Sequence, residues 1–428
     1  MKYKDSMYNN IFKIGSEQYL YNAHSGLFCK IDKETLSYIK EIEMNKEAEQ
    51  NRNFSFLLKK GVIVPENINE FNMIRIRSLS EQYSYESSNM SFVIATTRNC
   101  NYNCVYCFEG ISHENVNMTE EIQEATVNFI INSLKKNTKC KNVYITWFGG
   151  EPLLNMQCIE YISKRLIKFC ETMNISYNAS VITNGLLLIP EIVNRLKILK
   201  VDSVQISIDG DEKEYCEYKG ATKQQFEKVL NNICKFPPDI RLQIRCNTDL
   251  KNYDSIKTVT QIIINKVKNI EKRNIIFYLA PIEEEQELAL NEKEFNDINY
   301  DYLQFLAKRK MFSSIKGNMP QPRYVSCGAL KKENYCIDSD GSLVKCEHYI
   351  GNYSKRCGDV FNGPNYASTE VDICCLPIKE KCRKCSIYPI CRGGCAQRRL
   401  DKKIDVNCKE FKRKVETCLF FLTMEENE

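Results

Sequence analysis

The feature that most constrains this chain is the number and spacing of its cysteines. There are 22 among 428 residues, three of them within residues 100–107 and twelve within the last 102 residues. Only three histidines accompany them, which disfavours mixed Cys/His zinc fingers. A disulfide framework is typical of small secreted proteins, and the N-terminal stretch MKYKDSMYNNIFKIG lacks the pattern of a signal peptide. The cysteines at short fixed spacing are therefore predicted to be metal ligands of a cytoplasmic protein.

Length and composition limit the remaining classes. A chain of 428 residues with 43% apolar and 11% aromatic residues is predicted to form two or three domains with real cores. The net charge of +5 is spread along the chain and gives no reason to expect nucleic acid as a partner. No apolar run is long enough to span a membrane, so we expect no membrane partner either.

Residues 1–85 are predicted to form a small module of strands and helices. We expect a strand pair at residues 18–20 and 27–31, helices at residues 33–43 and 54–60, and a strand at residues 62–64. Such a sheet exposes an edge that can take up an extended peptide as an added strand. The alternative is a subdomain that serves packing alone.

Residues 86–310 alternate short apolar strands with amphipathic helices. The expected strands are residues 92–96, 143–147, 179–183, 203–207, 241–246 and 275–279, and the expected helices include residues 120–135, 159–171, 190–200 and 224–236. This order predicts an α/β fold with a parallel sheet or an incomplete barrel, whose ligands bind at the carboxyl ends of the strands. Residues 311–428 are rich in cysteine and turn residues, so we expect metal coordination to supply stability that burial does not.

Three cysteines, Cys100, Cys104 and Cys107, directly follow the first of these strands. Thiolates at this spacing on one loop can converge on a soft metal centre. Three ligands leave one iron of a four-iron cluster open to a substrate or cofactor, whereas a closed structural site needs a fourth. A structural zinc knuckle that borrows a distant cysteine is the alternative.

Short polar motifs follow the next strands. They are Gly149-Gly150-Glu151-Pro152, Asn184-Gly185, Ser207-Ile208-Asp209-Gly210, and Arg245 with Asn247. Each alone is a common strand-ending turn. In this order, and together with the cysteine spacing, they resemble the radical S-adenosylmethionine (SAM) superfamily over about 220 residues.

That resemblance implies a partial (β/α)6 barrel and a site for SAM. Cys100, Cys104 and Cys107 would hold a [4Fe–4S] cluster, and the Gly149–Glu151 motif would hold the methionine amino group. Tyr106, Asn184, Ser207, Asp209 and Arg245 would contribute to cofactor binding. The implied chemistry is reductive cleavage of SAM to a 5′-deoxyadenosyl radical, which abstracts a hydrogen atom from the substrate.

The C-terminal cysteine spacing resembles the SPASM domain, which binds two auxiliary [4Fe–4S] clusters. By that resemblance, Cys382, Cys385, Cys391 and Cys408 would hold an outer cluster, and Cys327, Cys346 and Cys395 an inner one. The fourth inner ligand is open: Cys336 and Cys357 are local candidates, and a site left free for a substrate thiolate is a third. A zinc ribbon is the alternative for the whole region.

The combination with residues 1–85, whose pattern resembles a PqqD-like winged-helix element, implies a maturase of ribosomally made peptides. We expect it to bind the leader of a precursor peptide and to form an intrapeptide crosslink. A thioether between a cysteine sulfur and a carbon is the favoured bond, and a carbon–carbon bond is the alternative. A flavodoxin or ferredoxin would supply electrons, and Glu347, next to Cys346, is a candidate base. The rivals are a formylglycine-forming sulfatase maturase and a non-catalytic iron–sulfur electron carrier.

Overall fold

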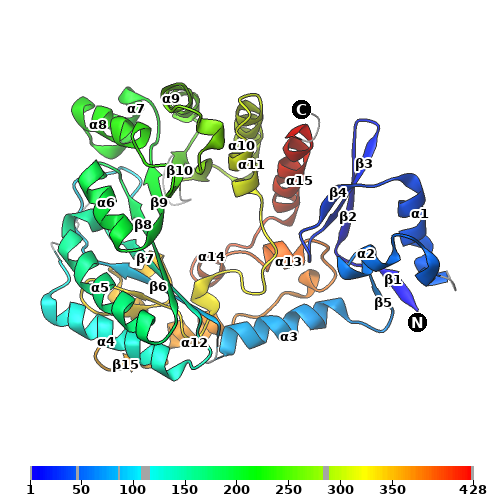
Figure 1. Ribbon diagram of the computed structural model, residues 1–428, viewed down its shortest axis with the longest axis horizontal. Helices are drawn as coiled ribbons and strands as arrows, with labels where there is room; N and C mark the ends of the chain where they lie inside the picture. The colour runs from blue at the N-terminus through cyan, green and yellow to red at the C-terminus, as the bar shows by residue number, and fades with distance from the viewer. Residues whose placement is uncertain (1, 45–47, 85–86, 108–115, 283–288, 426–428) are drawn as a thin grey trace.

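A large parallel sheet organises the molecule (Figure 1). The computed structural model describes residues 2–44, 48–84, 87–107, 116–282 and 289–425. Six strands lie side by side in chain order, namely β6 (Asn89–Ala95), β7 (Asn142–Phe148), β8 (Ser176–Thr183), β9 (Val201–Ser207), β10 (Arg241–Thr248) and β11 (Ile275–Pro281). All neighbours in this series are parallel. The predicted α/β fold is confirmed, and each strand includes the residues predicted for it, apart from Thr96, which follows β6.

Helices return the chain between the strands and cover the sheet. They are α4 (Glu120–Lys136), α5 (Met156–Thr172), α6 (Pro190–Ile198), α7 (Glu212–Lys219), α8 (Lys223–Cys234), α9 (Tyr253–Lys266), α10 (Glu292–Ala307) and α11 (Phe312–Asn318). Local signals set several starts: Thr119 caps α4, and Thr222 forms a capping box with Gln225 at α8. Alternate residues of the strands are fully buried, as in β8, because one face packs under these helices.

The sheet continues into the cysteine-rich region. Strand β12 (Tyr335–Ile337) pairs in parallel with β6, placing Cys336 opposite Val93, and β13 (Leu343–Val344) pairs with β12 in antiparallel orientation. Just beyond these strands, Arg98 forms a two-pronged ion pair with Asp338, at 3.1 and 2.7 Å, with both side chains almost fully buried. The sheet therefore crosses the boundary predicted at residue 311, and a buried charge pair ties its two parts together.

The N-terminal residues form a separate small lobe (Figure 1). Strands β2 (Asn9–Ile14), β3 (Glu17–Asn22) and β4 (Phe28–Lys30) make an antiparallel sheet, β1 (Tyr3–Asp5) pairs with β5 (Ile63–Pro65), and the helices are α1 (Lys33–Glu41) and α2 (Phe54–Lys59). The predicted strand pair and both helices are present, while β1 and β2 were not predicted. Helix α3 (Glu70–Tyr83) connects this lobe to the rest of the molecule. The predicted domain boundary at residues 85–86 lies outside the described residues.

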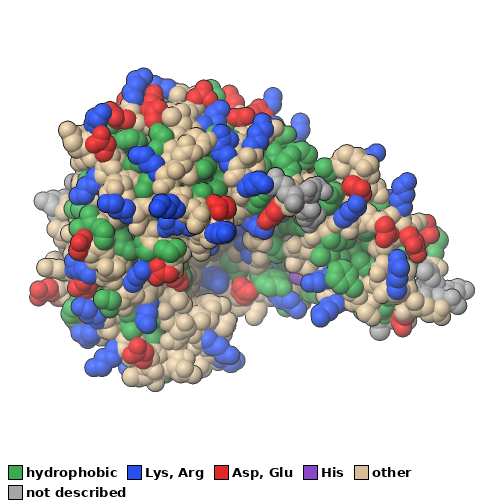
Figure 2. Space-filling model, turned by 45° about the horizontal axis from the view of Figure 1, so that its top comes forward, with side chains coloured by type: hydrophobic (Ala, Val, Ile, Leu, Met, Phe, Trp, Pro, Cys, Tyr) green, Lys and Arg blue, Asp and Glu red, His purple; other side chains and the backbone are tan. Residues whose placement is uncertain are grey.

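The C-terminal region has little regular structure, as predicted. It contains β14 (Gly358–Asp359), β15 (Gly363–Pro364), α12 (Ser368–Cys374), α13 (Tyr388–Cys391), α14 (Ala396–Leu400) and one long helix, α15 (Cys408–Glu425). Helix α15 packs against α10 and α11. Figure 2 shows Lys and Arg interspersed with Asp and Glu on one face of the molecule. Among the described helices, none has the length and apolar character needed to cross a membrane.

Candidate active site

A cavity of about 280 Å³ lies at the carboxyl ends of the parallel strands. Its lining brings together most of the side chains that the sequence singled out, namely Cys100, Cys104, Tyr106, Cys107, Gly149, Gly150, Asn184, Ser207, Arg245, Asn247 and Glu347. Two predicted cofactor residues, Glu151 and Asp209, do not line the cavity and lie behind its wall, fully buried. The named residues come from six separate segments and meet at one place, where this class of fold binds ligands.

The cysteine loop is held by the end of α7. The backbone N–H of Asn103 donates to the carbonyl of Lys219 at 3.1 Å, and that of Val105 donates to Tyr218 at 3.0 Å. Burial, together with the charges of Glu151 and the two neighbouring thiols, raises the pKa of Cys100 to about 11. Binding of a metal ion to this thiol therefore releases a proton.

Gly149 and Gly150 let two loops pack backbone to backbone. A Cβ on Gly149 would lie 2.1 Å from the carbonyl oxygen of Thr97, and one on Gly150 would lie 2.4 Å from that of Asn99. Gly149 also has a φ of +123°, which side chains other than hydrogen rarely allow. The pair of glycines is thus required by the contact with the cysteine loop as well as by any ligand.

The carboxylate of Glu151 forms its hydrogen bonds within the protein. It accepts hydrogen bonds from the N–H of Leu153 (3.1 Å), the hydroxyl of Thr183 (2.8 Å) and the N–H of Asn184 (2.8 Å). Burial raises its pKa to about 7, although these three donors favour the charged form. The prediction that this carboxylate itself faces a ligand ammonium does not fit its position: Glu151 fixes the turns after β7 and β8.

Asp209 is the centre of a buried polar network that sequence reasoning saw only in part. It accepts a hydrogen bond from the N–H of Asn247 at 2.8 Å and one from the hydroxyl of Tyr106, and it forms an ion pair with Lys219 at 3.0 Å. The ammonium of Lys219 also donates to Ser207 at 2.6 Å. Burial lowers the pKa of Lys219, but the charges of Asp209 and its neighbours outweigh that effect and hold the pKa well above the ordinary value.

Lys219 was missed because a lysine in the last turn of a helix is an ordinary surface residue in sequence terms. Its side chain is 2% exposed and lines the cavity. No short motif marks it. Only the packing of α7 against the cysteine loop brings it to the predicted residues.

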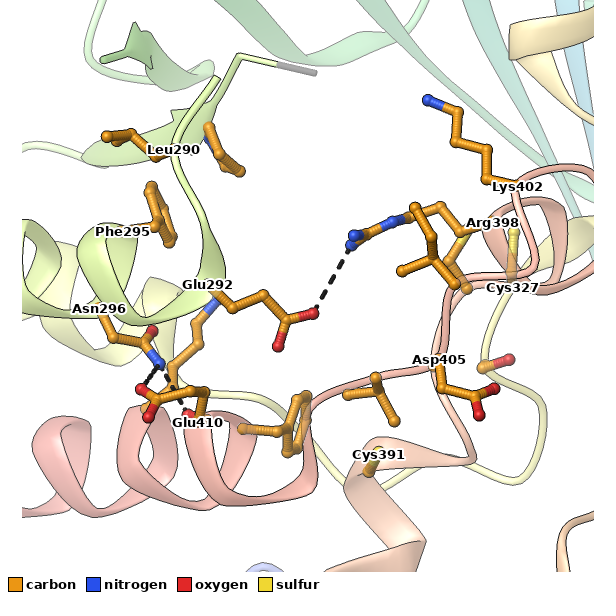
Figure 3. A pocket seen from close by; sticks show the side chains of 18 of the residues that line it. Leu290, Glu292, Phe295, Asn296, Cys327, Cys391, Arg398, Lys402, Asp405 and Glu410 are labelled. Carbon is orange, nitrogen blue, oxygen red and sulfur yellow. Dashed lines mark hydrogen bonds and ion pairs between the residues drawn. The ribbon is translucent and has the colours of Figure 1, made fainter. Parts of the chain in front are cut away.

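A second, larger cavity of about 560 Å³ adjoins the first and shares Arg245, Pro281 and Ile282 with it. Figure 3 shows its two sides: Leu290, Glu292 and Phe295 belong to the barrel side, and Arg398 and Lys402 to the C-terminal side. Glu292 and Arg398 face each other across it at 3.9 Å. Both apolar and charged groups are therefore available to an occupant.

The C-terminal cysteines fall into two groups whose charges interact within each group. Cys327, Cys346 and Cys395 form one, and Cys382, Cys385, Cys391 and Cys408 the other. Cys327, Cys391 and Cys395 reach the wall of the larger cavity. Glu347, exposed on the turn after Cys346, lies close to Cys327 and Cys346 and lines the smaller cavity.

The two candidates for an extra inner ligand occupy different places. Cys336 is buried on β12, with Cys327 and Cys346 near enough to raise the pKa of its thiol beyond the effect of burial. Cys357 instead donates its thiol hydrogen to the carbonyl of Leu343 at 3.3 Å. The charges that act on it are those of Glu370, Lys345 and Cys374, and none of the inner cysteines is among them.

Iron–sulfur clusters require soft sulfur ligands. Among the described residues, three thiols and no fourth line the smaller cavity, which is called the SAM-side cavity below. In the described parts of the chain, no three His, Cys, Asp or Glu side chains are arranged around a single metal ion. A preformed tetrahedral zinc site is thus not found there.

Residues 94–236 match the family model for the Radical SAM superfamily. This segment is a radical SAM domain. The family uses SAM and a [4Fe–4S] cluster, so the three thiols of the cysteine loop fit the cofactor that the family implies.

Similarity to individual proteins extends beyond this domain. The chain is 26% identical over 341 residues to a cysteine-type anaerobic sulfatase-maturating enzyme of Clostridium novyi, covering 69% of this chain and 85% of that protein. It is 32% identical over 141 residues to the uncharacterized protein MJ0804 of Methanocaldococcus jannaschii, covering 33% of this chain and 41% of that protein. Its radical SAM domain is therefore joined to further segments that only some relatives share.

Two solved structures share the fold. Native anSMEcpe with bound AdoMet and Kp18Cys peptide matches with a TM-score of 0.62 and 19% identity, covering 79% of this chain and all of that one. Streptococcus suis SuiB bound to precursor peptide SuiA matches with a TM-score of 0.51 and 16% identity, covering 92% of this chain and 95% of that one.

Proposed function

We propose that this radical SAM enzyme binds a ribosomally made precursor peptide and installs an intrapeptide crosslink, a bond between a cysteine sulfur and a carbon atom. The observation that carries the proposal is the pair of adjoining cavities. The smaller one holds the SAM-type residues, and the larger one opens from it through Arg245 toward Cys327 and Cys395. A volume of about 560 Å³ is large enough to admit several side chains of a peptide.

The comparisons support a peptide as the substrate. anSMEcpe and SuiB were both solved with peptides bound, and SuiB is described with a precursor peptide. The match to anSMEcpe covers 79% of this chain and the match to SuiB covers 92%, so the longer overlap is with the structure described with a precursor peptide.

In the proposed assignment, Cys100, Cys104 and Cys107 hold the SAM-binding cluster. When bound, SAM and its cluster would supply the one-electron chemistry that removes a hydrogen atom from a substrate carbon. Gly149, Gly150, Asn184, Ser207 and Arg245 line the pocket for the cofactor, and the Asp209–Lys219 pair holds Ser207 and Tyr106 in place. These charges are fixed before any ligand arrives, so the site reorganises little on binding.

We further assign two auxiliary clusters to the C-terminal groups. Cys382, Cys385, Cys391 and Cys408 supply four thiols to the outer one, and Cys327, Cys346 and Cys395 supply three to the inner one. Cys336 is the proposed fourth inner ligand, because it lies with Cys327 and Cys346 while Cys357 lies elsewhere.

The N-terminal sheet is the proposed binding site for the leader of the peptide. In β4, Cys29 faces β3 in register with Leu20, so the backbone N–H of Lys30 points to the free edge of the sheet. An extended peptide can pair there as a fourth strand. The lobe would then act as a PqqD-like recognition module.

Lys30→Pro tests this assignment because proline removes the outward N–H and is tolerated on an edge strand. With the precursor from a neighbouring reading frame, we expect about three- to tenfold weaker peptide binding and correspondingly less crosslinked product, the loss of one hydrogen bond. Binding is measured by fluorescence anisotropy and product by mass spectrometry. Lys30→Ala, which keeps the N–H but removes the exposed contact with Glu17 at 2.8 Å, is the matched control.

The mass of the product also identifies the reaction. A sulfur–carbon or carbon–carbon crosslink removes two hydrogen atoms, and reductive or alkylating treatment tells the two apart by the free thiol. Formation of formylglycine from cysteine, the second candidate favoured by the sulfatase-maturating relative, replaces the sulfur by an aldehyde oxygen. That product, unaffected by Lys30→Pro, would refute the leader-binding proposal. If no 5′-deoxyadenosine forms with SAM and dithionite, the enzyme assignment itself fails.

Glu347 is the proposed base that accepts a substrate proton. It lines the SAM-side cavity next to the inner sulfurs and is open to solvent, to which it can pass the proton. Glu347→Gln is expected to lower crosslinking about 10²-fold, while 5′-deoxyadenosine formation and iron content stay normal. Unchanged crosslinking would remove Glu347 from the mechanism.

A further inference from the structure

A third cavity, of about 460 Å³, lies between helix α3 and the cysteine-rich region. Its lining includes Leu79 and Tyr83 of α3 and Leu376 and Tyr388 of the C-terminal region. It shares Ser326 and Gly394 with the larger cavity of about 560 Å³, but it shares no lining residue with the SAM-side cavity. It therefore adjoins the larger cavity on one side and is lined on the other by helix α3, the element that leads to the N-terminal lobe.

Among the described residues that line this cavity, every charged side chain is positive. They include four arginines, Arg75, Arg383, Arg392 and Arg399, and no Asp or Glu. Acidic neighbours outside the lining reach two of them: Glu380 pairs with Arg383 at 2.8 Å, and Asp405 lies 4.0 Å from Arg399. For Arg75 and Arg392, no carboxylate lies within ion-pair distance in the described parts of the chain.

The guanidinium of Arg392 is held in place by its neighbours, but one of its nitrogen atoms has no hydrogen-bond acceptor. It lies over the ring of Tyr388, 4.4 Å from its centre, and donates to the hydroxyl of Ser78 at 2.6 Å. Its Nη1 atom is buried and has no hydrogen-bond partner. The Nε atom of Arg399, a side chain 9% exposed, is likewise buried without a hydrogen bond.

Because Arg75 and Arg392 have no carboxylate within ion-pair distance among the described residues, a carboxylate bound in the cavity would gain charge-assisted interactions with them. The rest of the lining is apolar or aromatic, including Leu330, Pro377 and Ile378. A ligand that alternates carboxylates with apolar side chains matches both properties. A small inorganic anion would leave the apolar part of the cavity uncovered.

We propose that this cavity binds an acidic, partly apolar segment of the peptide substrate, between the part held by the N-terminal lobe and the part that reacts. The inference rests on the proposed function in taking the substrate to be a peptide. The segment contacts Arg75 and Arg392 through its carboxylates. It thereby sets how far the reacting residue extends into the larger cavity.

The test uses the iron-loaded full-length enzyme and a fluorescein-labelled octapeptide of alternating Glu and Leu. Binding is followed by anisotropy, with the Gln/Leu peptide as the matched probe. We expect Arg75→Gln and Arg392→Gln each to weaken binding of the Glu/Leu peptide about tenfold, and the Gln/Leu peptide to bind weakly throughout. Arg195→Gln, on the remote helix α6, is the control and leaves the affinity unchanged.

Because Arg392 adjoins Cys391, the iron content of the Arg392→Gln variant is measured. Arg75→Gln, on α3, tests the same proposal away from that cysteine. Equal binding of the Glu/Leu peptide by wild type and both variants overturns the proposal. The proposal is also overturned if the Gln/Leu peptide binds as tightly as the Glu/Leu peptide. Full displacement of the Glu/Leu peptide by an equal concentration of inorganic phosphate would overturn it too, because that result would show a site for small anions. Absence of 5′-deoxyadenosine in the wild type would refute the proposed function and leave these affinities unaffected.

Discussion

The carboxyl end of the barrel and the cysteine-rich C-terminal region carry similar sets of thiols on very different supports. Around Cys100, the loop is fixed by backbone hydrogen bonds to α7 and by the buried Glu151 and Asp209 networks. Around Cys382 and Cys391, the chain runs through turns and helices of four or five residues. The fold holds the first set of thiols in place, whereas cluster binding by the second set is proposed to help stabilise the fold.

This difference has a physical origin. Parallel strands satisfy their backbone groups among themselves and bury alternate side chains, so the barrel is stable without ligands. A segment with few regular elements buries less apolar surface and gains its stability from cross-links, here the proposed clusters. The two regions are expected to respond oppositely when cysteines or iron are removed.

The largest effect is expected when the barrel cysteines are replaced. Cys100→Ala, Cys104→Ala and Cys107→Ala together should abolish 5′-deoxyadenosine formation, because these are the only thiols among the described residues that line that cavity. The circular dichroism spectrum should stay that of the wild type, and about two-thirds of the iron should remain if three clusters are bound. Loss of most of the iron or of the fold would mean that the barrel, too, depends on its cluster.

Removal of iron by an anaerobic chelator should affect the C-terminal region first. We expect faster amide exchange over residues 380–408 and little change in the strands β6 to β11, measured by hydrogen–deuterium exchange with mass spectrometry. Equal protection of both regions after iron removal would contradict the idea that cluster binding stabilises the C-terminal fold. The chelated enzyme with iron and sulfide restored is the control.

A smaller effect is expected from Asp338→Asn, which breaks the charge pair between the two regions. The change leaves the guanidinium of Arg98, with 7% of its side chain exposed, with Asp340 at 3.3 Å as its remaining carboxylate, and should cost about 1–3 kcal/mol of unfolding free energy. Thermal unfolding of the iron-loaded enzyme measures it. Asp254→Asn, which breaks the exposed pair with Lys257 at 2.9 Å, should change stability by less than about 0.5 kcal/mol.

Much of the site was predictable because strand-end motifs need only the rule that parallel strands place their carboxyl ends together. That rule placed Cys100, Ser207 and Arg245 around one cavity. It did not find Lys219, whose role depends on α7 packing beside the cysteine loop, and it misjudged Glu151, whose carboxylate faces inward. Contacts between segments distant in sequence leave no periodic trace in either one.

The sequence by itself determined the α/β alternation, the cysteine spacings and the radical SAM resemblance, because each depends on residues close together along the chain. The tertiary structure decided which of Cys336 and Cys357 lies with the inner cysteines, how the cavities adjoin, and that four arginines from α3 and the C-terminal region line one cavity. Those relations depend on how elements pack. Packing is a property of the whole core, and no single segment encodes it.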